Sequence, residues 1–335
     1  RNTLYFEGIM GKSEVWVNGE KAAEHLGGYL PVIVNLDKWL KPGQKNVIVV
    51  KADNSNDGSY PPGKPQESLD FAYFGGIYRD AYLISTGPVY ITDPNEAGTV
   101  AGGGIFFRTQ SLDPRTRKGK TAVKVQVANN TDKEQKVRVQ ALMTDPKGVD
   151  PVGETAPLVI PPHSTGEVDI PLVISNVRPW SPDNPNLYTL SVEVWKADGG
   201  TDAKNPAHLL DNRSMRVGIR TVEITEKGLV LNGSLFPEKL IGGNRHQDFA
   251  RLGNAVPNNL QWQDAVKLRK AGMRVIRSAH YPQDPAFMDA CDRLGLFVIV
   301  ATPGWQFWGK GPFADRVYDD VRQMVRRDRN HPSVM

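Results

Sequence analysis

The chain has 335 residues, long enough for two or three domains of about 150 residues each. Its 41 basic and 37 acidic side chains nearly balance at a net charge of +4, whereas nucleic-acid binding needs basic residues clustered on one face. No apolar run approaches the ~18 residues needed to cross a bilayer, and a single cysteine, Cys291, excludes an internal disulfide. We therefore expect no nucleic-acid or membrane partner.

Residues 1–87 are typical of an all-β region. The strand-like runs, in chain order, are LYFEGI, SEVWV, YLPVIVNL, KNVIVVKA and RDAYLIS. The pair Asn18-Gly19 predicts a hairpin turn, and NTLYFEG, although it resembles a protease-cleavage tag, alternates like a native strand. Short strands at this spacing indicate a jelly-roll β-sandwich, which we expect to be incomplete at its N-terminus.

Residues 88–220 contain longer runs that alternate polar and apolar residues more regularly. These runs are TAVKVQVANN, KVRVQALMTD, STGEVDIPLVI, YTLSVEVWKA and SMRVGIRTVEI. Polar turns such as Asn129-Asn130 separate them. The pattern predicts an immunoglobulin-like β-sandwich, a domain whose usual role is a spacer, although binding and enzymatic roles stay open.

Residues 221–335 change from a period of 2 to one of 3.6 residues. EKLIGG, RVIRS and LFVIVA predict three strands, the last buried on both faces. Asn258 or Asn259 can cap a first helix, NLQWQDAVKLRKAG, and Asp284-Pro285 can begin a second. The second helix places one group of residues on a single face: Phe287, Ala290, Cys291 and Leu294. A third helix carries an apolar stripe of Ala314, Val317, Tyr318, Val321, Met324 and Val325.

Strands that alternate with helices predict a parallel sheet. A doubly wound sheet needs a GxGxxG turn after its first strand, and GGNRHQD lacks that spacing. We therefore expect the first three βα units of a (β/α)8 TIM barrel, with a fourth strand that begins at Ser333. The dense basic cluster on the third helix is expected to be a solvated face; it comprises Arg322, Arg326, Arg327 and Arg329.

Polar side chains follow all three predicted strands, at the end where barrel enzymes place their chemistry. These ends carry His246 and Asp248, then Arg277 and His280, then Trp305 and Trp308. Sugars suit this mixture, because their hydroxyls need donors and acceptors and their C–H faces pack on aromatic rings. Each residue also has a structural alternative: a satisfied polar group for the histidines, loop packing for the tryptophans, an ion pair for Arg277.

Other chemistries fit less well. A Ser-His-acid triad on a sharp turn would show GxSxG, which the chain lacks. His246 and His280 are metal-ligand types, but neither HExxH nor a cysteine pair accompanies them. The three polar strand ends therefore favour a sugar site over a metal site.

GGNRHQDF and IRSAHYP resemble the paired signatures of glycoside hydrolase family 2, the group of β-galactosidases, β-glucuronidases and β-mannosidases. Further segments resemble the family in the order in which it has them, over nearly the whole chain. They are SEVWVNGEKAAEHLGGY, DGSY with LDFAYFGGIYRD, RPWSPDNPNLYTL, VGIRTVEI and DRNHPSV. The resemblance implies a retaining β-glycosidase that uses one glutamate as acid/base and another as nucleophile, with the two carboxyls ~5–5.5 Å apart.

By the same resemblance, both glutamates are expected beyond Met335, so that no catalytic residue lies within the chain. Asp70 is implied to reach a substrate hydroxyl from the first domain, and His246 and Asp248 to line the mouth. Arg277 is implied to hold the nucleophile ionised, and His280 to bond the sugar. Trp305 and Trp308 are implied to flank the site as stacking surfaces.

Some β-galactosidases of the family bind Mg²⁺ through a loop carboxylate near the third strand. Here TPGWQFW follows that strand without a carboxylate, so we expect no cofactor and no metal. DGSY and the downstream LDF favour an exo-acting β-galactosidase. β-Glucuronidase or β-mannosidase is the alternative within the family, and a non-catalytic carbohydrate-binding protein is the alternative of another class. We expect the 335 residues alone to be inactive, and the sequence leaves homo-oligomerisation and compartment open.

Overall fold

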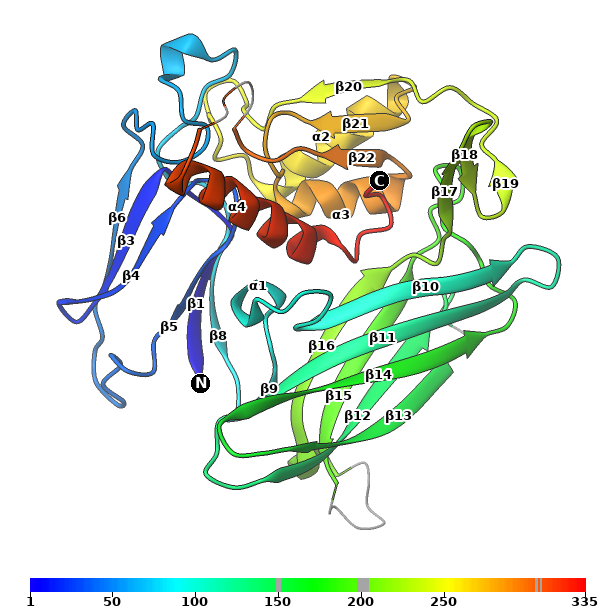
Figure 1. The fold of residues 1–335 in the computed structure, drawn as a ribbon, viewed down its shortest axis with the longest axis horizontal. Helices are drawn as coiled ribbons and strands as arrows, with labels where there is room; N and C mark the ends of the chain where they lie inside the picture. The colour runs from blue at the N-terminus through cyan, green and yellow to red at the C-terminus, as the bar shows by residue number, and fades with distance from the viewer. Residues whose placement is uncertain (149–151, 198–204, 305–306, 308) are drawn as a thin grey trace.

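The computed structural model describes residues 1–148, 152–197, 205–304, 307 and 309–335. Three consecutive parts of the chain pack against one another (Figure 1). We call them the first sandwich, with strands β1 to β8, the second sandwich, with β9 to β16, and the α/β part, from β20 to α4. The three predicted architectures are confirmed, and the barrel is open after three strands.

The first sandwich is built on antiparallel sheets that contain most of the predicted strands. Its elements are β1 (Asn2–Phe6), β2 (Ile9–Met10), β3 (Lys12–Val17), β4 (Glu20–Leu26), β5 (Val32–Asn35), β6 (Ile48–Asp53), the 3-10 helix η1 (Gln66–Ser68), β7 (Gly76–Ile77) and β8 (Ala81–Ser85). Strand β1 lies between β5 and β8, so the tag-like NTLYFEG is an integral strand. Asn18 and Gly19 both have positive φ, 52° and 90°, as the predicted hairpin between β3 and β4 requires.

The second sandwich has two four-stranded sheets around one apolar core. Its elements are β9 (Val89–Ile91), α1 (Pro94–Ala97), β10 (Ile105–Asp113), β11 (Lys118–Asn129), β12 (Gln135–Thr144), β13 (Val152–Ile160), β14 (Ser164–Ile174), β15 (Tyr188–Lys196), η2 (Pro206–His208) and β16 (Leu209–Val217). One sheet has the order β10-β11-β14 with β9 beside β11, and the other β13-β12-β15-β16. Valines that alternate along β11, β12 and β15 fill the space between the sheets.

The segment SMRVGIRTVEI is two strands rather than one. Strand β16 ends at Val217, and a small antiparallel sheet follows: β17 (Val222–Thr225), β18 (Gly228–Leu231) and β19 (Ser234–Leu235). The chain leaves β16 at Gly218, where a Cβ atom would lie 2.6 Å from the Pro332 side chain and 2.9 Å from Trp180. Only glycine fits at this close approach, where the chain turns from one sheet to the other.

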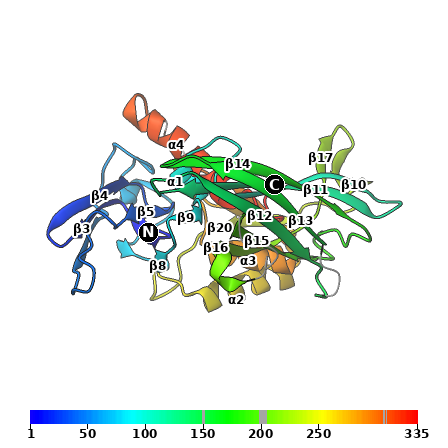
Figure 2. The same cartoon turned by 90° about the horizontal axis from the view of Figure 1, so that it is seen from below.

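The α/β part has three parallel strands in the order β20-β21-β22. Its elements are β20 (Gly242–Arg245), α2 (Asn258–Lys270), β21 (Val275–Ser278), α3 (Pro285–Leu294), β22 (Phe297–Val300) and α4 (Pro312–Asp328). Helices α2 and α3 lie on one side of the sheet, and α4 lies on the other, toward the two sandwiches (Figures 1 and 2). A parallel bridge between Val298 and Val334 begins the predicted fourth strand. Within the described residues, no helix is long and apolar enough to cross a membrane.

Three local predictions in the α/β part are wrong. Strand β20 begins four residues later than EKLIGG, because Gly242 packs so closely on the Val275 carbonyl that a Cβ would lie 1.6 Å from its oxygen. Helix α2 has Pro257 at its N-cap rather than an asparagine, and the side chain of Asn258 donates to Asp80 instead. Strand β22 is not buried on both faces, since Ile299 is 45% exposed.

The basic cluster on α4 is only partly a solvated face: Arg322 is exposed, but the end of the helix that carries the other three arginines lies beside α1 and the segment that follows it. Arg326 and Arg329 donate hydrogen bonds to backbone carbonyls of residues 98–103, at distances of 2.5–2.8 Å. Arg327 forms a two-pronged ion pair with Asp328, at 2.7 and 2.8 Å. Gly102 and Gly103 are buried, so Arg329 satisfies two carbonyls that water reaches poorly, whereas the bond from Arg326 to Gly98 is exposed.

Candidate active site

The ends of β20 and β21 bring together residues that the sequence predicted at separate strand ends. Arg277 in β21 donates a hydrogen bond from Nη1 to Nδ1 of the buried His280, over 3.1 Å. The ring of His246, which follows β20, has its centroid 5.4 Å from that of His280. Asn244 Oδ1 lies 3.5 Å from Arg277 Nη1 and adds a neutral acceptor. Neighbouring parallel strands thus deliver these side chains to one mouth.

Both histidines are neutral near pH 7. Burial lowers the pKa of His280, and the charges of Arg277 and His246 act in the same direction. Burial also lowers the pKa of His246, although Asp248 and Asp70 oppose it. A guanidinium has no acceptor, so Nδ1 of His280 accepts from Arg277 and the proton of the neutral ring is on Nε2. His280 therefore offers a fixed N–H donor to the mouth.

A loop of the first sandwich forms one wall of this mouth. Asp70 Oδ1 lies 4.0 Å from His280 Nε2, and its side chain is 58% exposed. The buried ring of Phe71 has its centroid 5.5 Å from His246 and 5.8 Å from His280. An exposed carboxylate beside an N–H donor and two flat ring systems suits a polyhydroxylated ligand.

The third strand end borders a hollow of about 400 Å³. Arg277 and His280 line it together with residues 299–304, Phe307 and Val317. The exposed face of Ile299 points into this hollow, which accounts for its exposure on β22. The predicted residues Trp305 and Trp308 lie outside the described residues.

Sequence reasoning missed the aromatic support under the histidines. Tyr281 stacks on Tyr29 of the first sandwich, with ring centroids 4.2 Å apart and an interplanar angle of 3°. Its hydroxyl lies 3.2 Å from His246 Nδ1 and accepts from the backbone N–H of Gln247 over 3.4 Å. Tyr281 and Phe71 each adjoin a predicted residue in the sequence, and that adjacency is the signal that could have found them.

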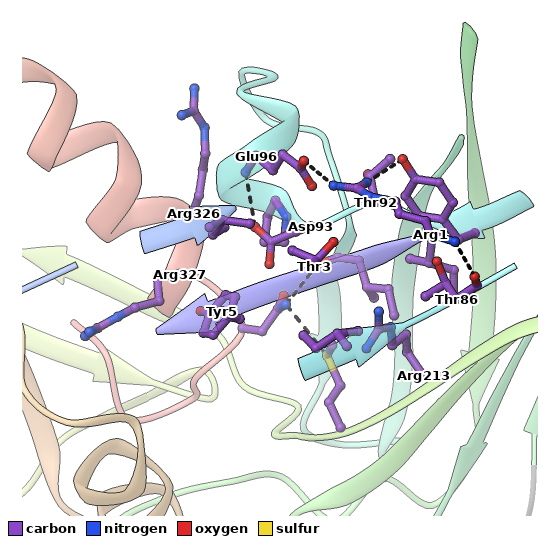
Figure 3. A pocket seen from close by; sticks show the side chains of 18 of the residues that line it. Arg1, Thr3, Tyr5, Thr86, Thr92, Asp93, Glu96, Arg213, Arg326 and Arg327 are labelled. Atoms are coloured by element: carbon purple, nitrogen blue, oxygen red, sulfur yellow. Dashed lines mark hydrogen bonds and ion pairs between the residues drawn. The ribbon is translucent and has the colours of Figure 1, made fainter. Parts of the chain in front are cut away.

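A second hollow, of about 270 Å³, lies where the three parts of the chain meet (Figure 3). Two of its charged groups have partners close by: Arg1 pairs with Glu96, and Asp93 accepts two backbone N–H groups as the cap of α1. Among the residues that the structure describes, the two hollows share no lining side chain. The second hollow is therefore a junction between the parts, separate from the histidine site.

Asp289, Asp292 and His331 place one potential ligand atom each within 4.8 Å of one another. Asp292 accepts a hydrogen bond from His331 Nδ1 over 2.6 Å and another from the backbone N–H of Ser333 over 3.0 Å. Burial would lower the pKa of His331, but Asp292 and its hydrogen bond raise it to about 9. We interpret the group as an ion pair that holds the segment after α4 against α3.

Comparison with known families covers nearly the whole chain. The model for the sugar binding domain of glycosyl hydrolases family 2 matches residues 1–88. The model described as glycosyl hydrolases family 2 matches residues 104–220, and the model for the TIM barrel domain of that family matches residues 222–335.

Individual relatives agree with these matches. A β-galactosidase of Thermoanaerobacter pseudethanolicus is 31% identical over 99% of this chain and 41% of its own length. A β-glucuronidase of Bacteroides fragilis is 28% identical over 99% of this chain and 46% of its own. The solved structure of Bacteroides uniformis β-glucuronidase 2, covalently bound to cyclophellitol-6-carboxylate aziridine, has a TM-score of 0.85 at 25% identity, over all of this chain and 38% of that one. The chain thus spans less than half the length of these relatives, and it belongs to glycosyl hydrolase family 2.

Proposed function

We propose that this chain is part of a retaining exo-β-glycosidase that removes terminal β-galactosyl residues from oligosaccharides or polysaccharides. The observation that carries the proposal is the meeting of Arg277, His280, His246 and Asp70 at one mouth of the open barrel. The β-galactosidase among the relatives supports the choice of substrate, and the segments DGSY and LDF of this chain favour it too. A β-glucuronidase or β-mannosidase activity is the alternative, and the β-glucuronidase relative favours the first of these.

The residues at the mouth offer a sugar both hydrogen-bond donors and acceptors. The Nε2–H of His280 donates to a sugar hydroxyl, and the Asp70 carboxylate, 4.0 Å away, accepts from the same or a neighbouring hydroxyl. Asp248 follows β20 and is exposed; its charge acts on His246, and we propose that it lines the same mouth. The buried His280 gives specificity, because a sugar that lacks the matching hydroxyl leaves its N–H donor unpaired.

Arg277 has an electrostatic role in this proposal. A guanidinium beside a carboxyl lowers the pKa of that carboxyl and keeps it ionised, as a nucleophile requires. The acid/base and the nucleophile are two glutamates ~5–5.5 Å apart, the separation of retaining enzymes. We place both in the part of the whole protein that lies outside this chain, since the chain spans less than half of its relatives.

The test is turnover of nitrophenyl β-galactoside, β-glucuronide and β-mannoside by the whole protein, with retention measured by NMR of the first-formed sugar. We expect nitrophenol release fastest from the galactoside, and loss of kcat/KM in His280→Asn and Asp70→Asn. His163→Gln, which alters an exposed histidine of the second sandwich, is the matched control and should behave as wild type. Sugar binding without release from any of these glycosides would leave a non-catalytic carbohydrate-binding protein as the better description.

We take the domains as residues 1–87, 88–220 and 221–335. The pairing of the strands supports these boundaries, because each sheet lies within one of the three ranges. The site is taken to need no metal or other cofactor, on the ground that TPGWQFW has no carboxylate. The 335-residue chain alone is taken to be inactive, since the edge of β22 is paired only by the bridge at Val334 and part of the α4 stripe is uncovered, with Tyr318 62% exposed.

A further inference from the structure

Arg79 of the first sandwich reaches into the α/β part directly beneath the two histidines. Its side chain is fully buried. Nη1 donates to the backbone carbonyl of Tyr29 in its own sandwich over 3.0 Å. Nη2 donates to Gln247 Oε1 and to the carbonyl of Pro282, each over 2.7 Å. One guanidinium thus joins the first sandwich to two separate segments of the barrel.

Those two segments are the ones that carry the site. Gln247 is the neighbour of His246, and Pro282 lies two residues after His280. The planar guanidinium holds Nη1 and Nη2 in fixed directions, so Arg79 binds the Tyr29 carbonyl through one nitrogen while the two N–H bonds of the other reach Gln247 and Pro282. The distance between the segments after β20 and after β21 is therefore set by Arg79 as well as by the strand pairing.

We propose that Arg79 is a positioning residue of the glycosidase site: it holds the segments after β20 and β21 so that His246 and His280 face the same sugar. This inference rests on the proposed function. We place Arg79 outside direct contact with the sugar: it acts through the segments that it binds, chiefly at Gln247 and Pro282. The first sandwich therefore aligns the barrel site as well as contributing a wall to it.

The experiment compares Arg79→Lys and Arg79→Gln with the whole wild-type protein on the nitrophenyl glycoside that wild type turns over fastest. Arg274→Gln is the matched control, because Arg274 also joins two parts of the chain, through Asp183 at 2.7 Å, but on the side of the barrel away from the histidines. We expect KM to rise and kcat/KM to fall by about 10²-fold in both Arg79 variants, the usual effect of a misplacement near 1 Å. Arg274→Gln should leave kcat/KM unchanged.

A second readout separates alignment from loss of stability. Burial lowers the pKa of both histidines, so a variant that exposes them to water should raise these pKa values. Because the site uses neutral histidines, the acid limb of the pH profile of kcat/KM should then move to higher pH. Gln247→Met removes one acceptor from the other side and should give the same change. The double variant Arg79→Lys/Gln247→Met should then lose less than the two single losses combined.

The outcomes are distinguishable. A folded Arg79→Lys or Gln247→Met protein with wild-type KM and an unmoved acid limb overturns the positioning role while the glycosidase function stands. If Arg79→Gln fails to fold, Arg79→Lys and Gln247→Met decide between these results. A wild-type protein that releases sugar from none of the glycosides overturns the proposed function, and the role of Arg79 in it falls too.

Discussion

The ion pair between His331 and Asp292 should make the stability of the protein depend on pH in the alkaline range. Asp292 and its 2.6 Å hydrogen bond raise the pKa of His331 from 6.5 to about 9 against the opposing effect of burial. Such a shift corresponds to about 3 kcal/mol of folding free energy. Because the folded pKa is the higher one, this contribution is complete below pH 6.5 and disappears as the pH rises through about 9.

The perturbation is His331→Gln, and the assay is urea unfolding followed by tryptophan fluorescence. Trp180 is a suitable reporter, since its buried indole N–H donates to the Asp292 carbonyl over 2.8 Å. We expect the variant to be about 3 kcal/mol less stable than wild type at pH 6, with a much smaller difference at pH 10. His163→Gln is the control: His163 also pairs with an aspartate, Asp132 at 2.8 Å, but at an exposed position where such pairs contribute little. A difference between wild type and His331→Gln that is equal at both pH values would refute the reasoning.

Three other predictions concern packing, reactivity and metal dependence. Gly242→Ala should destabilise the protein by more than about 4 kcal/mol, because its Cβ would lie 1.6 Å from the Val275 carbonyl oxygen; an unchanged urea midpoint would contradict this. Burial raises the pKa of the Cys291 thiol far above its usual range, so Ellman's reagent should react with it only after denaturation, and rapid reaction of the native protein would show the packing to be wrong. Dialysis of the whole protein against EDTA should leave kcat/KM unchanged, and restoration of lost activity by Mg²⁺ would reveal a metal site.

The sequence predicts the second sandwich well because most of its strands are long and have one buried face. Strand β14, for example, has the bounds that the alternation of STGEVDIPLVI predicts. Strands β10 and β13 were missed: β10 begins with three consecutive apolar residues, Ile105 to Phe107, and β13 contains Pro157, so neither run alternates like a regular strand.

In the α/β part, periodicity predicts the helices but not the details of their ends. Helix α3 has the predicted cap, Asp284, because a local Asp-Pro pair is sufficient to begin it. Strand β20 was misplaced because its position depends on Gly242 against the Val275 carbonyl, a contact between residues far apart in sequence. The basic cluster on α4 was misinterpreted for the same reason, since its partners lie in the second sandwich.

At the candidate site, the sequence indicates which polar side chains are candidates for function, and only the fold shows which residues pack against them. His246, Arg277 and His280 could be named from their place after strands. The stacking of Tyr281 on Tyr29 could not be predicted, because the residues around each tyrosine give no indication that the other lies nearby. Long-range supports of this kind leave no periodic trace in a single sequence.

The wall formed by Asp70 and Phe71 has a consequence for protein engineers who shuffle modules among related glycosidases. A barrel grafted onto a foreign scaffold leaves part of its recognition surface behind. If the proposed site is right, exchange of the short loop around Asp70 between two homologues, with both barrels untouched, should alter their relative preference for different sugars. Under that proposal, the accessory module takes part in the choice of substrate.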